Sequence, residues 1–348
     1  MRGRAHRVVA WWKRRRRQQK LAILLGIAGL IVLVVVLTTQ VFFEPEPPTR
    51  VAPNQTEPDE ATRMELAKRF APILRLDSRE LFVPVDRSVY LSATALEKRD
   101  HGKLTVLDED PGVDELPTSA EGCTAKVRCA IFLDIEGVEP PRSKPAAYDA
   151  IEERALTGGD HPAIHVHVTQ YDDTGEYAIQ YWFLYFYNHR LNQHESDWEQ
   201  ITLRLDSEKK PVEAFYSSHE AGTRKTWSKL EHDGDHPVVY VAQGTHANYF
   251  TRGTHSVTIA CTPLLKAARV CVRKRTIRDR TNGRKVLNET DYGLAELTGP
   301  IFVGGYGSGN YVAGKRIKGN VSDPRTRRPA WSDPLERLRA ATKLARVA

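Results

Sequence analysis

A histidine, two carboxylates and a tryptophan follow one another closely in the segment NQHESDWEQITL, residues 192–203. Side chains alternate between the two faces of a β-strand, so Asp197 and Glu199 point to one side and Trp198 points to the other, into the core. His194 lies at the entrance of this strand and can fold back toward the two acids. Asn188, at the end of the preceding apolar segment, lies across the hairpin from them.

This combination of side chains predicts a site for a divalent cation. Two carboxylates a few ångströms apart repel each other unless a cation or a proton lies between them. Imidazole nitrogen and carboxylate oxygen atoms together suit Mg²⁺, Ca²⁺, Mn²⁺ or Zn²⁺. The alternative interpretation is a solvated polar face without an ion, because strands with polar residues on one face are common.

Other polar motifs leave two interpretations each. His165 and His167 in IHVHV share one face of a predicted strand, where they either bind metal or form a half-exposed face. The run Ser217-Ser218-His219 follows no G-x-S-x-G elbow, and adjacency in sequence does not create a catalytic triad. Residues 266–285 hold nine Lys or Arg residues and one acid, which suits either a solvated hairpin or contact with anionic headgroups or polymers.

The segments that position these residues have the pattern of short β-strands. From Ala163 onward, β-branched and aromatic runs alternate with turn residues, which predicts an antiparallel sheet or sandwich. The run YAIQYWFLYFYN, residues 177–188, is apolar throughout, so we expect a central strand buried on both faces. Peripheral helices are expected over residues 61–74 and 141–159. The resulting prediction is a mainly β fold, with one antiparallel β-sandwich domain over residues 62–333.

The N-terminal part has the pattern of a membrane anchor. Leu21–Phe43 contains no charge, and a helix of this length covers about 35 Å, enough to cross a hydrocarbon core of about 30 Å. A cleaved signal peptide is the alternative, but its apolar core is normally shorter, and no small-residue cleavage site follows Phe43.

The segments around this anchor predict a single-pass protein of the plasma membrane. Basic residues 1–20 form a cytoplasmic tail, which places the C-terminal domain outside the membrane. Residues 44–61 are rich in proline and acids and form an extended spacer. Residues 334–348 form a basic amphipathic helix at the C-terminus.

The net charge of +7 does not predict nucleic-acid binding. The tail, residues 1–20, holds nine Lys or Arg residues and no acid, which leaves 42 basic and 44 acidic groups in the rest of the chain. The basic character therefore belongs to the tail and not to the main domain.

Four cysteines lie on the predicted outer side as two closely spaced pairs. In an oxidising compartment we expect two local disulfides, Cys123–Cys129 and Cys261–Cys271, although other pairings remain open. A zinc site of four thiolates is the alternative, but no CxxC spacing is present.

Several motifs occur in a characteristic order: FAPILRLDSRELFVPVD, QYWFLYFYN, HESDWEQITL, AFYSSHEAG, VVYVAQGTHANYF, and GGYGSGNY followed by DPRTRRPAWSDP. In this order they resemble the Vps62 (vacuolar protein sorting-associated protein 62-like) family over about residues 65–333. The HxxDWE core is also similar to the GHRHDWE heptad of the necrosis- and ethylene-inducing-like proteins. Those proteins are secreted β-sandwich cytolysins that hold a divalent ion and recognise plant sphingolipid headgroups.

The resemblance implies metal ligands at His194, Asp197 and Glu199, which match the first histidine and the two acids of the heptad. Asn188 falls where the cytolysins have a carboxylate, so this chain offers a neutral oxygen there. Ser196 replaces the second heptad histidine. Cytolysis is not implied, because the domain is predicted to be anchored beside its own membrane.

Two further histidines match the motifs. His219 in YSSH corresponds to a polar residue near the same site and is included among the expected ligands, and His246 in GTHANY corresponds to a histidine of the Vps62 pattern. The first hypothesis is a binding module that uses the cation to hold a glycan, a lipid headgroup or an envelope polymer. The alternatives are a metal-assisted hydrolase with His219 or His246 as general acid or base, and a structural scaffold without a ligand. The Vps62 family implies no transferable activity, so the sequence does not establish an enzyme.

Overall fold

The computed structural model describes residues 54–119, 129–140, 142–157, 161–190, 193–219, 221–263, 271–312, 315–317, 321–326, 330–336 and 338. The chain divides into a large unit, Ala52–Ala260 with Lys274–Ala348, and a second unit, Met1–Val51 with Cys261–Arg273. The elements below belong to the large unit, except for the ends of one hairpin.

Several predicted segments lie outside the described residues. They are the basic tail, the anchor Leu21–Phe43, most of the spacer, and residues 339–348 of the expected C-terminal helix. Among the helices that the structure does describe, none has the length and apolar character needed to cross a membrane.

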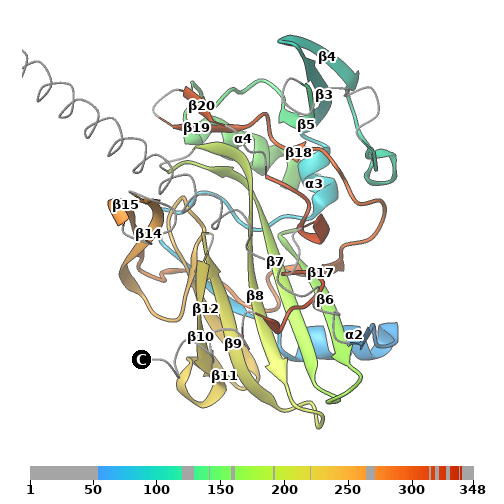
Figure 1. Cartoon of the computed structure of the whole chain (residues 1–348), viewed down its shortest axis with the longest axis vertical. Coiled ribbons are helices and arrows are strands. Elements are labelled where there is room, and N and C mark those ends of the chain that lie inside the picture. The colour runs from blue at the N-terminus through green and yellow to red at the C-terminus, as the bar shows by residue number, and fades with distance from the viewer. Residues whose placement is uncertain are drawn as a thin grey trace, which may run out of the picture. The chain divides into compact units, whose positions relative to one another are not determined.

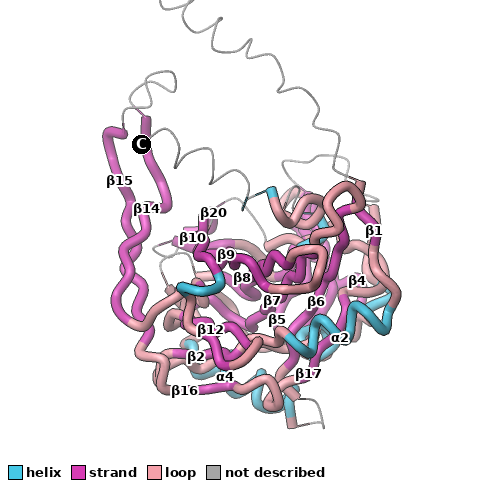
Figure 2. The backbone as a smooth tube through the Cα atoms, turned by 90° about the horizontal axis from the view of Figure 1, so that it is seen from below, coloured by secondary structure: helices cyan, strands magenta, loops and turns pink. Residues whose placement is uncertain are grey.

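The fold is mainly β, as predicted, and most strand pairs are antiparallel (Figure 1). The largest sheet has seven strands: β1 (Gln55–Thr56), β6 (Ala163–Tyr171), β7 (Tyr177–Asn188), β8 (His194–Leu205), β9 (Pro211–Ser218), β10 (Ala221–Thr226) and β17 (Gly293–Glu296). Their order is β1-β6-β7-β8-β9-β10, and β17 pairs with β6 in parallel. Figure 2 shows β6 to β9 side by side.

A five-stranded sheet contains β2 (Ile73–Leu76), β11 (His232–Asp233), β12 (His236–Val241), β13 (Asn248–Tyr249) and β16 (Lys285–Leu287). A four-stranded sheet contains β3 (Thr94–Asp100), β4 (Lys103–Asp108), β5 (Cys129–Ile135) and β18 (Gly305–Tyr306). Two further pairs are β14 (Gly253–Pro263) with β15 (Cys271–Thr281), and β19 (Asn310–Val312) with β20 (Lys315–Ile317). Three parallel pairs, β6 with β17, β2 with β12 and β5 with β18, depart from the antiparallel prediction.

The helices are short and few: α2 (Glu60–Arg69), α3 (Arg87–Leu91), α4 (Pro145–Leu156) and the 3₁₀ turns Val113–Glu115, Trp227–Lys229 and Pro324–Thr326. Helix α2 confirms the first predicted helix, and Asp59 caps it by accepting the Thr62 N–H at 2.9 Å. Helix α4 confirms the second, and its N-terminal proline suits the first turn because that N–H needs no partner there.

One hydrophobic core joins strands of the seven-stranded and five-stranded sheets. It includes Tyr181 and Tyr185 of β7, Leu203 of β8, Leu74 of β2 and Val239 of β12. All 12 residues of β7 are buried, so the prediction of a central strand covered on both faces is confirmed. The long apolar strand β7 therefore fixes the β7–β8 hairpin in the core.

The sequence analysis did not predict the four-stranded sheet. Strand β3 contains the charged run Glu97–Asp100, and most of β4 is exposed, so neither strand has the clean apolar alternation of a half-buried strand. Pairing between β3 and both of its neighbours provides the backbone hydrogen bonds instead.

The structure describes the side chain of one of the four cysteines, Cys129. Cys129 is disulfide-bonded at the start of β5, and its expected partner Cys123 lies outside the described residues. Cys261 and Cys271 lie on the paired strands β14 and β15, but their side chains are not among those described. The pairings themselves stay predictions.

Candidate functional site

The β7–β8 hairpin brings the predicted site residues to one place. Asn188 pairs with His194 at the end of the hairpin, and Tyr185 pairs with Asp197, which lies three residues further along β8. Trp198 is 3% exposed and lies in the core, as predicted from the alternation of the strand. We call the group around this hairpin end the polar cluster; its members are Glu80, Asn188, His194, Asp197, Glu199, Ser217, His219, His246 and Asp279.

His246 connects two carboxylates within the polar cluster. Its Nδ1 lies 2.9 Å from Asp197 Oδ2, and its Nε2 lies 3.4 Å from Glu80 Oε1. The ring is fully buried and stacks on Tyr185 with 3.9 Å between the centroids. Glu80 also accepts the backbone N–H groups of Phe82 and Gly244.

These contacts determine the charges of the three groups. Burial opposes the charge on His246, but the carboxylates of Glu80 and Asp197 outweigh it and raise its pKa to about 10. Burial likewise opposes ionisation of both acids, yet their interactions with His246 lower the pKa of Asp197 and of Glu80. At neutral pH the group is therefore an imidazolium held between two carboxylates.

The pKa of Glu199 is shifted in the opposite direction from those of Asp197 and Glu80. Its two oxygen atoms accept the Ser217 hydroxyl and, at 3.3 Å, the His219 backbone N–H. Burial and the negative charge of Asp197 raise the pKa of Glu199 to about 8. This carboxyl group therefore carries a proton at neutral pH when no other cation lies beside it.

His219 is held by an acid from a distant strand. Its Nε2 lies 2.8 Å from Asp279 Oδ2, and Asp279 also accepts the hydroxyl groups of Thr245 at 2.9 Å and Tyr249 at 2.5 Å. Burial opposes the charge on His219, but the hydrogen bond to Asp279 raises its pKa. The ring of His219 is therefore already paired with a carboxylate.

His194 and Asn188 have clear hydrogen-bond roles. His194 Nδ1 lies 2.6 Å from the Ser196 carbonyl, so this nitrogen carries the hydrogen and Nε2 keeps a lone pair. Burial lowers the pKa of His194, so the ring is neutral at pH 7. Asn188 donates Nδ2 to Asp197 Oδ2 at 2.9 Å and accepts the Arg190 N–H with Oδ1 at 3.1 Å.

The five residues expected to bind a cation thus lie in the same region but interact with protein partners. Throughout the described ranges, no group of three or more His, Cys, Asp or Glu side chains is arranged to hold a metal ion. The oxygen of Asn188 and the Nε2 of His219 are both used in other hydrogen bonds, whereas His194 keeps the tautomer of a metal ligand. Cation binding by this cluster remains a prediction.

Three residues of this region have a backbone conformation that is unusual for non-glycine residues. The φ angles are 55° for Ser196, 59° for His219 and 53° for His246. Left-handed conformations of this kind carry a steric cost and persist where surrounding contacts hold them. Ser196 is fixed by its hydroxyl, which donates to the Tyr306 carbonyl at 2.9 Å.

Two acids of the polar cluster were not identified from the sequence. Glu80 lies within the motif FAPILRLDSRELFVPVD, and Asp279 is the one acid of the basic stretch 266–285. The alternation around Asp279 could have identified it as a buried acid. Ile277, Asp279 and Thr281 are buried, whereas Arg278 and Arg280 are exposed. A lone carboxylate on the inward face of a basic strand requires a partner.

The alternative histidine pair is used in packing. His167 stacks on Trp331 with 3.9 Å between the centroids, and its Nδ1 lies 2.9 Å from Gln180 Oε1. His165 accepts the Arg87 backbone N–H at 3.2 Å and is buried. The half-exposed face expected as the alternative to metal binding holds for His167 only, because His165 is 2% exposed.

Comparison with known proteins identifies one family that matches part of the chain. The sequence model of the family described as vacuolar protein sorting-associated protein 62 matches residues 152–260. No curated protein matches the chain. Among solved structures, NLPPya in complex with mannosamine is 19% identical, with 57% of this chain and 71% of that chain covered and a TM-score of 0.30.

A second solved structure, the non-toxic HaNLP3 protein, is 14% identical, with 57% of this chain and 72% of that chain covered and a TM-score of 0.31. The segment matched by the family includes the whole β7–β8 hairpin together with His219 and His246, but neither Glu80 nor Asp279. Over residues 152–260, the predicted resemblance to the Vps62 family is thus confirmed.

Proposed function

We propose that this chain is a membrane-anchored binding module whose polar cluster holds a divalent cation and, through that ion, an oxygen-rich ligand of the cell envelope. The observation that carries the proposal is the pair of buried carboxylates, Asp197 and Glu199, two residues apart on β8. Burial and the charge of Asp197 raise the pKa of Glu199 to about 8, so the two carboxylates would be stabilised by an additional positive charge beside them. A divalent ion would replace the proton on Glu199.

His194, Asp197 and Glu199 would hold the ion. The neutral ring of His194, anchored through Nδ1 to a backbone carbonyl, offers Nε2 as a ligand, as is usual for metal-binding histidines. The ion would supply positive charge and free coordination positions for hydroxyl, carboxylate or phosphate oxygen atoms. A glycan or a lipid headgroup provides such atoms.

Binding requires an exchange of partners within the polar cluster. Asp197 Oδ2 accepts hydrogen bonds from Asn188 and His246, and Glu199 accepts the Ser217 hydroxyl. At least one of these contacts must loosen when the ion binds. The proton released from Glu199 makes affinity for the ion increase with pH.

The location of the module follows from the N-terminal sequence. An anchor at Leu21–Phe43, with a basic cytoplasmic tail, would hold the β domain outside the plasma membrane. The ligand would then be a component of the envelope within reach of residues 44–61.

Metal content and thermal stability of the purified full-length chain test the proposal. We expect about one divalent ion per chain, a lower melting temperature after EDTA treatment, and recovery when the ion is returned. The double variant Asp197→Asn/Glu199→Gln should lack the ion and show no response to EDTA. Asp173→Asn/Glu208→Gln, which neutralises two exposed acids, is the matched control and should behave like the wild type.

Metal content and melting temperature of the wild-type chain test the proposal even if the double variant folds poorly. A chain without bound metal, whose melting temperature does not change on addition of Mg²⁺, Ca²⁺, Mn²⁺ or Zn²⁺, would overturn the cation proposal. The internal hydrogen bonds of the polar cluster would then support the structural scaffold. The hydrolase alternative has less support, because the ring of His246 is fully buried and that of His219 is paired with Asp279.

A further inference from the structure

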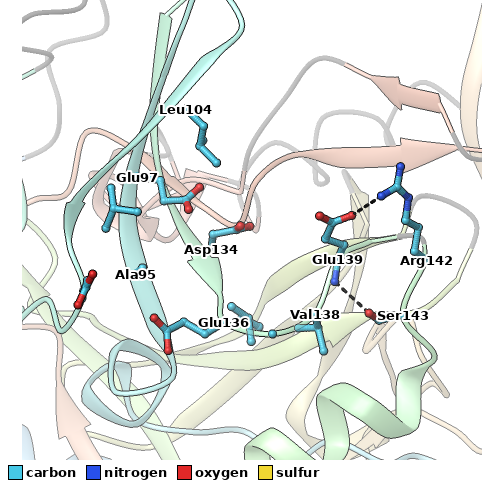
Figure 3. A pocket seen from close by; sticks show the side chains of 13 residues that line it. Ala95, Glu97, Leu104, Asp134, Glu136, Val138, Glu139, Arg142 and Ser143 are labelled. Carbon is cyan, nitrogen blue, oxygen red and sulfur yellow. Dashed lines mark hydrogen bonds and ion pairs between the residues drawn. The ribbon is translucent and has the colours of Figure 1, made fainter.

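A second acidic region lies on the four-stranded sheet and shares no residue with the polar cluster. It is a pocket of about 780 Å³, formed by β3, β4, β5 and the loop that follows β5 (Figure 3). Five carboxylate side chains line it: Glu97, Glu109, Asp134, Glu136 and Glu139. Among the described residues that line it, Arg142 is the one cation, and it is already bound to Glu139 at 2.9 Å.

Two of the carboxylates have buried oxygen atoms without a hydrogen-bond partner. Glu97 is 8% exposed, and within the described part of the chain neither its Oε2 nor Asp134 Oδ1 has a partner. Figure 3 shows the two carboxylate groups close together in the pocket. A buried carboxylate oxygen that lacks a partner is costly, so this pair is arranged for a donor that comes from outside the chain.

Two residues lie behind the pocket next to Asp134. Glu195 and Ser308 both hydrogen-bond the Asp134 carboxylate, and the Ser308 N–H also holds Glu195 at 3.3 Å. These contacts fix the position of the Asp134 side chain, yet its Oδ1 has no partner among the described residues.

The β4 side of the pocket, next to Glu97, is apolar. Leu104 and Val106 of β4 both line it, and each is 47% exposed, which is high for large hydrophobic side chains that share one short strand. Adjacent apolar and acidic walls suit a ligand that has an apolar part and a positive charge. A single metal ion would fill little of this volume and would leave the apolar wall without a contact.

We propose that this pocket binds a small organic ammonium ligand, with its charged nitrogen between the carboxylates of Glu97 and Asp134 and its apolar part against Leu104 and Val106. The ammonium group supplies the N–H donors that Glu97 Oε2 and Asp134 Oδ1 lack. The two carboxylates also compensate its charge. Burial raises the pKa of both acids, so binding weakens at acidic pH as they take up protons.

Isothermal titration calorimetry of the full-length chain tests this site with n-butylamine, which is an ammonium ion at neutral pH. The neutral probe 1-butanol has the same apolar chain, and CaCl₂ at equal ionic strength tests for a metal site. We expect butylammonium to bind and butanol to bind at least about ten-fold more weakly, since a charge-assisted hydrogen bond is lost. Glu97→Gln should weaken butylammonium binding by about ten-fold or more.

Glu208→Gln is the matched control, because it removes one negative charge from an exposed turn outside the pocket, and its affinity should equal that of the wild type. Unchanged affinity in Glu97→Gln, or equal affinity for butanol and butylammonium, would overturn the proposal. Binding of Ca²⁺ that excludes butylammonium would replace it with a metal site. An unaltered melting temperature of Glu97→Gln shows that the result does not come from misfolding.

Discussion

His246 and Asp197 form a buried ion pair, with 2.9 Å between His246 Nδ1 and Asp197 Oδ2. The other ring nitrogen faces Glu80 at 3.4 Å, so one imidazolium serves two carboxylates from distant parts of the chain. The three groups together carry one net negative charge, and the protonated Glu199 beside them adds none at neutral pH. The charge state of the polar cluster therefore depends on His246.

Replacement of His246 by glutamine should strongly destabilise the protein. The variant leaves Glu80 and Asp197 buried without their positive partner, and removal of one member of a buried ion pair typically costs about 3–5 kcal/mol. Urea denaturation at neutral pH measures this free energy of unfolding. His161→Gln, at an exposed position, should change it by less than about 0.5 kcal/mol. Similar values for the two variants would show that the buried pair contributes little.

The stability of the wild type should decrease at alkaline pH. The pKa of His246 rises from 6.5 to about 10 on folding, so its contribution is complete below the unfolded pKa and is lost as pH rises through about 10. The slope approaches about 1.4 kcal/mol per pH unit. Glu199 and Glu152, with pKa values raised to about 8, give the same sign at lower pH. Burial raises the pKa of tyrosines such as Tyr181 and Tyr185 above 10.0, which gives the same sign as pH approaches about 10, so the window from about pH 8 to about pH 9 reports on His246.

Chemical denaturation from about pH 7 to about pH 9 checks this dependence in wild type and in His246→Gln. The variant should lose the slope between about pH 8 and about pH 9, whereas His161→Gln should keep it. A wild-type stability that stays level through this window would mean that His246 is neutral in the folded protein.

Glu199→Gln should have an effect that changes with pH when EDTA removes any divalent ion. Near pH 4.5 the wild-type side chain is a neutral acid in the folded protein, so the neutral amide should cost only about 1 kcal/mol. Between 4.5 and about 8 the unfolded wild type loses this proton while the folded protein keeps it, which lowers wild-type but not variant stability, so the difference should shrink or reverse as pH rises to about 8. Denaturation at about pH 5 and about pH 9 measures both values. An equal difference at the two pH values would contradict the raised pKa of Glu199.

The sequence was sufficient to predict the hairpin that carries the site. The apolar run of β7, the turn after Asn188 and the alternation around Trp198 are local patterns, and each determines burial or facing within a few residues. The same local signals predicted helices α2 and α4. Local periodicity therefore placed Asp197 and Glu199 together on one face of a strand, although it did not predict that this face is buried as well.

The charge balance of the site could not be predicted in the same way. Glu80 precedes β7, and Asp279 lies on β15, so both reach the polar cluster only through long-range packing. A sequence motif shows which residue types lie close together in the chain, but not which side chains pair in the folded protein. The expected ligand His219 illustrates this, since its imidazole contacts Asp279 and its backbone contacts Glu199.

Asp279→Asn should lower the pKa of His219. The carboxylate is the partner that offsets burial and raises this pKa, and the amide removes the charge while it keeps the shape. Titration of the histidine ring signals by NMR measures the change. Asp173→Asn, an exposed replacement, should leave the His219 signal unchanged. An unshifted His219 pKa in Asp279→Asn would show that Asp279 does not control its protonation.

Gly307→Ala should destabilise the protein because the backbone of this residue passes close to β8. Gly307 has φ of 91°, and a Cβ atom there would lie 2.7 Å from the Glu195 carbonyl oxygen and 2.8 Å from Glu195 Cβ. The added methyl group has to displace the strand that carries Asp197 and Glu199, at a cost of about 1–3 kcal/mol beyond the backbone strain.

Gly102→Ala separates the steric cost from the backbone strain. Gly102 has a similar φ of 88°, but nothing lies within 4 Å of the position of its Cβ. Both variants therefore carry a comparable cost for a left-handed alanine, and the difference between their free energies of unfolding measures the contact with Glu195. Equal destabilisation by the two substitutions would mean that β8 moves away freely, and the polar cluster would then lack a rigid base on this side.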